Sequence, residues 1–532
     1  MKINYKKTIP VCVAIILSGL SYAQAPAIEW QKSLGGTNSD RAHTIIQTAD
    51  GGYMISGASN SNNGNVTGNH GNQDYWLAKL NAIGNLQWQK SLGGTGNDYG
   101  SSIIQTADGG YVVAGTSDSN NGDITGNHGL TDGWVLKLNS DAGIIYWQKS
   151  FGGTNYDVIN QIIPTADGGY IFAGNSSSNN GDVPGNNGYV DYWIVKINSD
   201  GNLQWKKSLG GTGDDRALSI VQTSDGGYTV AGYAENNNGD VTGNHGGKDY
   251  WILKLNTDGG VIFWKKSLGG SHQDLAYSIK QTSDGGYIVA GNAFSNDGDV
   301  TGNHDGTDAW IVKLNSDGNL QWQKALGGTK VDDASSIIQT ADGGYLAVGS
   351  TTSNDGQVTG YHTPSSTGPG EAPLSYDYWA VKLSATGNIQ WQKCLGGSGS
   401  DEASSVIQAS DGGYIIAGSS NSNNGDVSGN HGNYDIWVVK LAQDNLATNE
   451  VLRDDIKVNV FPNPAKDNIT LKLDYFTPSM EVTITDMLGK TIHTQKLEGL
   501  TTKINIGNIE KGIYFLNLIG GKENVSKKFI KE

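Results

Sequence analysis

Most of the chain alternates between short apolar runs and clusters of turn-forming residues. In the first such stretch the apolar runs cover residues 41–48, 52–59, 74–81 and 86–93, and β-branched and aromatic residues dominate them. Segments such as ADGG and NAIGN separate neighbouring runs and are typical of tight hairpin turns. Runs such as WIVKL lack polar alternation, which indicates strands that are covered on both faces. The pattern predicts a unit of four short antiparallel strands.

This unit repeats along the chain, and two series of tryptophans mark the repeats. Successive members lie 58 or 59 residues apart, except for one interval of 69 residues in each series, which marks an insertion in the sixth unit. The first series is Trp30, Trp88, Trp147, Trp205, Trp264, Trp322 and Trp391, and the second is Trp76, Trp134, Trp193, Trp251, Trp310, Trp379 and Trp437. Four strands per unit at a fixed period are typical of a β-propeller.

The two ends of the repeat region complement each other. The chain enters with IEWQKSLGG, a lone fourth strand, and leaves after DIWVVKLAQDN, where a fourth strand is missing. We expect the N-terminal strand to complete the last blade and close the ring, which removes two exposed strand edges. The predicted fold is all-β: a seven-bladed β-propeller over residues 26–444 and a small β-sandwich over residues 458–532. A solenoid or a string of separate small β domains is the alternative, but neither needs complementary ends.

Composition and charge agree with this fold and limit the classes of molecule that the protein could bind. The chain has 532 residues with 77 glycines and only 17% charged residues, which argues against disorder and against helical bundles. Its net charge of −16 argues against nucleic acid as a partner. Residues 1–25 resemble a secretory signal peptide, with Lys2, Lys6 and Lys7 before a short apolar core. No other stretch has the length and hydropathy of a transmembrane segment.

Recurring charged residues are interpreted as structural. An aspartate precedes each first strand, from Asp40 to Asp401, and another precedes the second tryptophan of each unit. An active site needs groups with different pKa values, so sevenfold recurrence favours roles in capping turns and bonding strands. A lysine recurs in each third strand, from Lys79 to Lys440, and is expected to pair with the aspartates or to lay its stem on a tryptophan ring. A histidine recurs in six units; spread around a ring, these histidines cannot gather on one metal ion.

The long loop between the second and third strands of each unit is the expected functional surface. Most of these loops carry an Asn-Gly-Asp or Asp-Gly-Asp segment, whose oxygens suit calcium, a hard cation. The carboxylates predicted to bind calcium are those of Asp123, Asp182, Asp240, Asp297, Asp299 and Asp426. A plain turn explains the same residues, because the spacing is not that of an EF-hand and there is usually one carboxylate per loop. Calcium is the one cofactor for which the sequence has a pattern.

The composition changes after residue 445, and four motifs follow in order. Residues 445–457 form a predicted linker, and residues 458–532 contain FPNP, DMLGK, KGIYF and KKFIK. The motif residues are Asn463, Pro464, Asp486, Gly489, Lys490, Gly512, Tyr514, Lys527 and Lys528. These motifs resemble the type A sorting domain of Bacteroidetes cargo of the type IX secretion system. The resemblance implies passage to the periplasm through the signal peptide and export by the type IX machinery to the cell surface or the extracellular space.

The sequence carries no phosphate loop, nucleophile elbow or zinc motif. The leading hypothesis is a secreted or cell-surface, non-enzymatic binding or adhesion protein. Its seven similar long loops would make multivalent contacts with an extracellular polysaccharide or a surface protein. The main alternative is a secreted glycan-cleaving hydrolase or lyase, with its active site near the propeller axis among the aspartates that begin at Asp40. A structural surface-layer component is the third reading.

Overall fold

The computed structural model describes residues 23–260, 262–364, 375–444, 458–473, 480–487, 490–497, 499–519 and 525–532. The described residues form strands and connecting turns, with no helix among them. The chain divides into two units, residues 1–444 and 445–532. Residues 1–22 of the predicted signal peptide, the linker at 445–457 and most of the insertion in the sixth unit lie outside the described residues.

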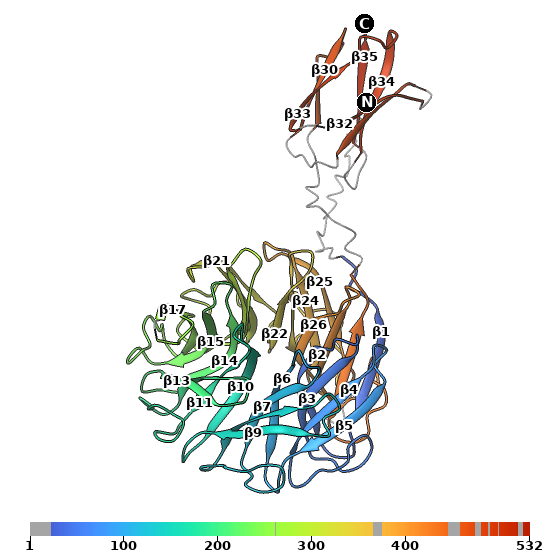
Figure 1. The fold of residues 1–532 in the computed structure, drawn as a ribbon. Helices are drawn as coiled ribbons and strands as arrows, with labels where there is room; N and C mark the ends of the chain where they lie inside the picture. The colour runs from blue at the N-terminus through green and yellow to red at the C-terminus, as the bar shows by residue number, and fades with distance from the viewer. Residues whose placement is uncertain are drawn as a thin grey trace, which may run out of the picture. The chain divides into compact units, whose positions relative to one another are not determined.

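The first unit contains seven four-stranded antiparallel sheets, arranged as blades around a common centre (Figure 1). The innermost strands are β2 (Asp40–Gln47), β6 (Asp98–Gln105), β10 (Asp157–Pro164), β14 (Arg216–Gln222), β18 (Asp274–Gln281), β22 (Ser336–Gln339) and β26 (Asp401–Gln408). Each contacts the innermost strand of the next blade, and β26 contacts β2. The ring of seven blades is therefore closed, which confirms the predicted propeller.

The remaining strands of each blade follow outward in chain order. The second strands are β3 (Tyr53–Ser59), β7 (Tyr111–Ser117), β11 (Tyr170–Ser176), β15 (Tyr228–Glu235), β19 (Tyr287–Ala293), β23 (Tyr345–Thr351) and β27 (Tyr414–Ser420). The third strands are β4 (Asp74–Leu80), β8 (Asp132–Leu138), β12 (Asp191–Ile197), β16 (Lys248–Leu255), β20 (Asp308–Leu314), β24 (Asp377–Leu383) and β28 (Asp435–Leu441). The outermost strands are β5 (Leu86–Leu92), β9 (Ile145–Phe151), β13 (Leu203–Leu209), β17 (Ile262–Leu268), β21 (Leu320–Leu326), β25 (Ile389–Leu395) and β1 (Ile28–Leu34).

The N-terminal strand closes the ring as predicted. β1 pairs antiparallel with β28, from Ile28 opposite Leu441 to Leu34 opposite Ile436. The last blade therefore joins the two ends of the repeat region, with β1 as its outermost strand. The ring is therefore closed by the pairing and packing of β1 with β28, with no turn joining these two strands.

The tryptophans pack the blades against one another. Trp134 is fully buried, and the Tyr75 ring of the preceding blade meets it edge-on at 4.8 Å between ring centres. The Tyr75 hydroxyl donates a hydrogen bond to the Trp134 carbonyl oxygen at 3.1 Å. In most blades every residue of the second and third strands is buried. This burial on both faces explains the apolar runs that the sequence shows.

An ion pair recurs at the tight turn of each blade. The Lys79 ammonium lies 2.8 Å from an Asp50 carboxylate oxygen, and the Asp50 carboxylate also accepts the backbone N–H of Gly52 at 3.0 Å. The same pairing joins the third-strand lysine and the turn aspartate in the other six blades. The lysine series predicted to pair with aspartates does so.

The second unit is a small β-sandwich. One sheet contains β29 (Val458–Phe461), β30 (Asn468–Leu473) and β33 (Thr501–Asn505). The other contains β32 (Thr491–Lys496), β31 (Glu481–Thr485), β34 (Gly512–Ile519) and β35 (Val525–Lys531). Ile469 and Leu471 of the first sheet share a buried core with Val482 and Leu516 of the second. Within the described part of the chain, no helix has the length and hydropathy needed to cross a membrane.

Candidate functional site

The aspartates at the start of the innermost strands are buried and hydrogen-bonded. In Asp98, one carboxylate oxygen accepts a hydrogen bond from the Ser117 hydroxyl at 2.5 Å. The other oxygen accepts the Gly94 N–H at 2.8 Å and the Ser119 hydroxyl at 3.0 Å. Asp40, Asp157, Asp332 and Asp401 make the same contacts. These carboxylates tie the loop between blades to the second strand and have no exposed surface to offer a substrate.

A second buried aspartate faces each of these from the preceding blade. The Asp74 oxygen Oδ2 accepts two hydrogen bonds from His70, one from the ring nitrogen Nδ1 at 2.7 Å and one from the backbone N–H at 3.0 Å. The other Asp74 oxygen is buried with no hydrogen-bond partner among the described residues. A Cβ at Gly93 would lie 2.6 Å from an Asp98 oxygen and 2.8 Å from an Asp74 oxygen, so only glycine fits between the two carboxylates.

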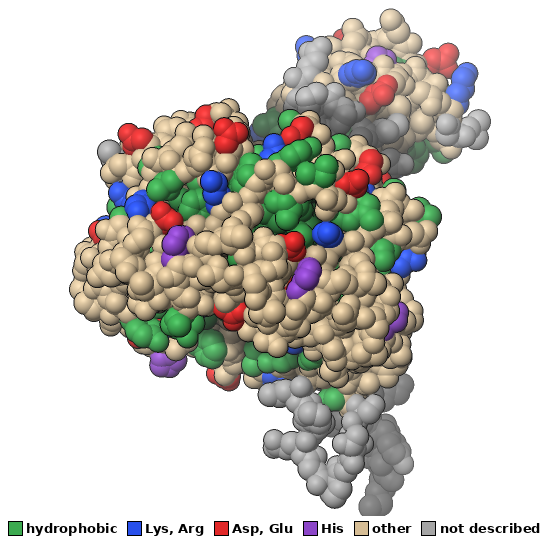
Figure 2. Space-filling model, turned by 60° about the horizontal axis from the view of Figure 1, so that its bottom comes forward, with side chains coloured by type: hydrophobic (Ala, Val, Ile, Leu, Met, Phe, Trp, Pro, Cys, Tyr) green, Lys and Arg blue, Asp and Glu red, His purple; other side chains and the backbone are tan. Residues whose placement is uncertain are grey.

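The histidine and aspartate pairs are distributed around the ring. Six blades have one such pair, and the third blade has Asn187 in place of the histidine, with its N–H donating to Asp191 at 2.8 Å. Burial raises the pKa of Asp191 to about 6 and that of Asp377 to about 7. On the face shown in Figure 2, histidine side chains lie apart from one another. Each pair joins the long loop of a blade to the start of the third strand of the same blade.

The loop carboxylates predicted to bind calcium are not brought together. They lie on loops of different blades, apart from Asp297 and Asp299, which share a loop. Asp123 accepts the Gly93 N–H at 3.2 Å, and Asp240, Asp299 and Asp426 accept the equivalent glycine N–H. Asp182 is half-buried in the same loop position. In the described residues, no group of three or more His, Cys, Asp or Glu side chains is arranged to hold a metal ion. Calcium binding stays a prediction.

The repeated polar residues of the long loops are also used within the fold. The Asn63 side chain accepts the Thr37 N–H at 2.9 Å and donates to the Thr37 hydroxyl at 3.0 Å. The Asn69 side chain donates to the Ser59 carbonyl oxygen at 2.8 Å. The positive φ of Gly64, 64°, requires glycine at the turn between them. The residues that recur in the loops thus account for the shape of the loops.

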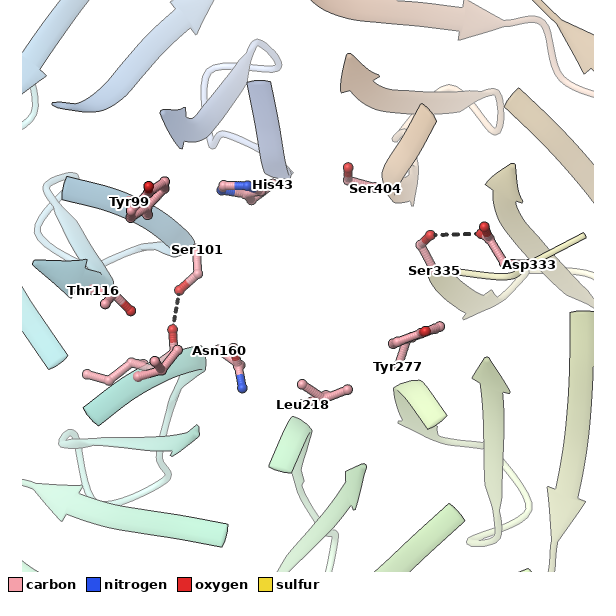
Figure 3. A pocket seen from close by; sticks show the side chains of 12 residues that line it. His43, Tyr99, Ser101, Thr116, Asn160, Leu218, Tyr277, Asp333, Ser335 and Ser404 are labelled. Atoms are coloured by element: carbon pink, nitrogen blue, oxygen red, sulfur yellow. Dashed lines mark hydrogen bonds between the residues drawn. The ribbon is translucent and has the colours of Figure 1, made fainter. Parts of the chain in front are cut away.

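A pocket of about 710 Å³ lies at the propeller axis. Figure 3 shows its side chains around an open centre. All seven blades contribute: most of the residues lie on the innermost strands, Thr116 lies on β7, and Asp333 and Ser335 directly precede β22. It is lined by His43, Tyr99, Ser101, Thr116, Val158, Ile159, Asn160, Leu218, Tyr277, Asp333, Ser335 and Ser404. We call this pocket the axial channel.

Two positions of the innermost strands change from blade to blade, although their neighbours repeat. The rim position, directly after the repeated aspartate, holds Arg41, Tyr99, Val158, Arg216, Leu275, Asp333 and Glu402. The inner position, two residues further on, holds His43, Ser101, Asn160, Leu218, Tyr277, Ser335 and Ser404. Every inner-position residue lines the axial channel, and so do three of the rim residues. The channel wall is therefore asymmetric within a nearly symmetric ring.

Several polar groups of the channel have capacity for further hydrogen bonds. His43 Nδ1 lies 3.1 Å from the Gly100 carbonyl oxygen and so carries the proton, which leaves Nε2 as an acceptor. Burial lowers the His43 pKa. Asp333 accepts the Ser350 N–H at 3.0 Å and the Ser335 hydroxyl at 3.2 Å through one oxygen, and burial raises its pKa to about 6. The Tyr277 hydroxyl accepts the Asn292 side-chain amide at 3.3 Å and can still donate.

The leading hypothesis placed function on the long loops, and the alternative placed an active site near the axis but among the aspartates that begin at Asp40, so neither identified the residues of the channel. The long loops form a repeated pattern in the sequence, whereas the channel residues differ from unit to unit and form no motif within a short strand. The signal that could have found them is the comparison of equivalent positions, because the rim and inner positions differ more between blades than the other positions of each first strand.

The described sorting-motif residues meet in the second unit. The Asn463 side chain accepts the Ile530 N–H at 2.9 Å and donates to the Lys528 carbonyl oxygen at 3.2 Å, which joins the first motif to the last. The Tyr514 ring stacks on Phe529 at 5.8 Å. Lys490 donates its N–H to Asp486 at 3.0 Å. Lys527 and Pro464 are exposed, and Gly512 begins β34, whereas Gly489 lies outside the described residues.

Comparison with solved structures gives distant likenesses. A quinohemoprotein alcohol dehydrogenase from Pseudomonas putida HK5 is 12% identical, with a TM-score of 0.40, over 82% of this chain and 79% of that one. Sqt1 from Chaetomium thermophilum is 10% identical, with a TM-score of 0.36, over 78% of this chain and 100% of that one. Likenesses at this level carry no information about activity.

Among curated proteins, an endo-acting ulvan lyase from Formosa agariphila is 34% identical over 92 residues. The match covers 17% of this chain and 17% of the lyase. It is too short to extend over the propeller.

The second unit matches a known family. Residues 459–532 match the family model described as a secretion system C-terminal sorting domain. This range contains the four motifs and the seven strands of the sandwich, except for Val458, the first residue of β29. The C-terminal unit is a secretion-system sorting domain, and the protein is type IX secretion cargo that is exported to the cell surface or the extracellular space.

Proposed function

We propose that the exported propeller is a non-enzymatic binding protein that holds a glycan in its axial channel. The observation that carries the proposal is the asymmetry of the channel wall. Residues that build the blades recur sevenfold, whereas the rim and inner positions do not. Packing between equivalent blades supplies no reason for this variety, but recognition of an asymmetric ligand does.

The chemistry of the wall suits a sugar. Tyr99 has 39% of its surface exposed, and Tyr277 lines the channel from the other side of the ring. Aromatic rings pack against the apolar faces of sugar rings, and the polar groups between them can bond hydroxyls. His43, Asn160 and Ser404 supply such groups. The volume of about 710 Å³ is in the range of small-ligand sites.

A glycan-cleaving hydrolase or lyase is the second candidate, and one observation favours it. Asp333, whose pKa burial raises to about 6, lies close enough to Tyr277 to affect its ionisation. Two neighbouring protonatable groups at a channel wall are the kind of pair that acid and base catalysis uses. The two candidates share one site, so a single assay separates them.

The test uses the full chain and a panel of soluble polysaccharides, with bound glycan and new chain ends measured together. Binding without new ends is the expected result. Tyr99→Ala should weaken binding about tenfold, because the variant loses one stacking face. Tyr146→Ala is the matched control, since Tyr146 is exposed on the outermost strand β9. New chain ends that disappear in Asp333→Asn would establish the enzyme instead, and equal binding by both tyrosine variants would contradict the channel as the site.

A further inference from the structure

The propeller uses arginine at only two places. The sequence has 36 lysines and arginines, of which three are arginine: Arg41, Arg216 and Arg453. Arg453 lies outside the described residues and outside the propeller. Arg41 and Arg216 occupy the same rim position of two innermost strands, β2 and β14. These strands belong to the first and fourth blades, so the two arginines stand on opposite sides of the ring.

The Arg41 guanidinium is held in place by its neighbours but keeps N–H groups that can bind a ligand. Its carbon lies 4.2 Å from the centre of the Tyr434 ring. One nitrogen, Nη1, lies 3.4 Å from the Glu402 carboxylate and 3.5 Å from the Ser419 hydroxyl. Nε and Nη2 make no hydrogen bond with any described residue. The side chain is 37% exposed, so these N–H groups are accessible to a ligand.

Arg216 has the same spare capacity. Its Nε donates to an Asp214 carboxylate oxygen at 2.7 Å, while the other Asp214 oxygen accepts the Lys248 ammonium at 2.6 Å. One carboxylate thus faces two cations, and a second carboxylate, that of Glu235, lies beside them, where it accepts the Asp214 N–H at 3.1 Å. In the described structure neither Nη of Arg216 has a hydrogen-bond partner, and the side chain is 41% exposed.

Lysine would serve equally well for solubility or for a surface ion pair, and this chain uses lysine for both. Arginine differs because its planar fork binds two oxygens of a carboxylate or a sulfate at once. Neither arginine lines the axial channel itself; both lie at its rim. We propose that the ligand of the channel extends over this rim and is an acidic saccharide, whose carboxylate or sulfate groups are bound there by Arg41 and Arg216. This inference rests on the proposed function, since it names the class of glycan that the channel takes.

The acidic residues of the rim do not cancel this preference. Glu402 is paired with Arg41, and Asp214 is shared by two cations. Glu235 accepts the Asp214 N–H and lies opposite Lys248 in the sheet. Asp333 is turned onto the backbone of Ser350. Free N–H groups thus remain on the two arginines, while the rim carboxylates already have partners.

The experiment measures affinity by titration of the full chain with three probes: oligogalacturonate, which carries carboxylates, sulfated carrageenan oligosaccharides, and uncharged malto-oligosaccharides. The variant Arg41→Lys/Arg216→Lys keeps the net charge but removes both planar guanidinium groups. It should bind the preferred acidic probe at least about tenfold more weakly, with binding of the uncharged probe unchanged. The comparison of the two acidic probes tells carboxylate from sulfate.

A second pair of variants controls for charge. Arg41→Gln/Arg216→Gln and Lys90→Gln/Lys149→Gln remove the same charge, but the lysines lie on the outermost strands β5 and β9. Only the arginine variant should lose affinity. Unchanged affinity of the arginine variants for acidic probes, or no preference of the parent protein for them, would overturn the inference while leaving the channel as a glycan site. No binding of any probe would overturn the proposed function with it.

Discussion

At the scale of single residues, a position that differs from its equivalents in the other blades identifies a side chain without the structural role that those equivalents share. Lys280 in β18 is such a departure, because it pairs across the sheet with Ile288 at a position where the other innermost strands are aliphatic. The equivalent residues are Ile46, Ile104, Ile163, Val221, Ile338 and Ile407. Lys280 is half-buried, burial lowers its pKa, and its ammonium has no hydrogen bond or ion pair among the described residues.

Lys280→Ile should therefore stabilise the propeller. The substitution removes a charge that has lost part of its hydration and restores the side chain that five other blades carry. We expect the free energy of unfolding to rise by about 1 kcal/mol, measured by denaturant titration. The reciprocal change, Ile104→Lys, should lower it. A loss of stability in Lys280→Ile would mean that the ammonium makes a contact that the fold needs.

The same comparison explains which residues the sequence could identify. The tryptophans and buried aspartates recur in every unit, so their structural roles could be inferred from recurrence, and the contacts of Asp98 and Trp134 agree. His43 and Tyr277 could not be assigned in this way, because nothing in a lone strand shows that these positions face an axis. Only the closed ring brings them together.

At the scale of elements, the strand runs predicted for the first unit agree with β2, β3, β4 and β5 within one residue at each end. Turn residues and β-branched runs are local signals, so these bounds follow from the sequence. The innermost strand of the sixth blade, β22, is an exception, because it begins only at Ser336. The Asp333 carboxylate accepts the N–H of Ser350, so a side chain replaces part of the strand pairing.

The closing strand β1 gives a prediction at this scale. Lys32→Pro in β1 and Lys207→Pro in β13 change equivalent residues, opposite Val438 and Ile194. Each proline removes one backbone N–H from an outermost strand. β13 is also joined to its blade by a tight turn, whereas no turn joins β1 to β28.

We therefore expect the melting temperature of Lys32→Pro to lie at least about 2 °C below that of Lys207→Pro. The Lys32 variant should also form larger species on size-exclusion chromatography, since a loosened β1 exposes the edge of β28. Equal melting temperatures would show that closure by β1 contributes little to stability.

At the scale of the whole molecule, the buried aspartates between blades make stability depend on pH. Burial raises the pKa of Asp249 and Asp308 to about 6 and that of Asp215 and Asp377 to about 7. A carboxyl whose pKa is higher in the folded than in the unfolded state binds its proton more tightly when folded. Its contribution is complete below the unfolded value of 3.8 and is lost as the pH rises through 6 to 7.

The turn aspartates have the opposite dependence. Hydrogen bonds from Lys79 and Lys196 lower the pKa of Asp50 and Asp167 to about 2, so their contribution is lost as the pH falls from 3.8 towards 2. Together the two sets place the maximum of stability near pH 4 to 5, with a decline towards pH 8. The propeller should therefore require more urea for unfolding at pH 5 than at pH 8.

Asp377→Asn tests the cause of this decline. The amide has the shape of the carboxyl but carries no charge, so the variant should keep more of its stability at pH 8 than the parent protein, by on the order of 2–4 kcal/mol. At pH 4, where Asp377 is protonated, the two proteins should differ little. Asp258→Asn, in an exposed turn, is the control and should follow the parent at both values. Urea titrations at pH 4, 5 and 8 measure all three proteins, and a parallel decline of Asp377→Asn with the parent would mean that other groups cause the pH dependence.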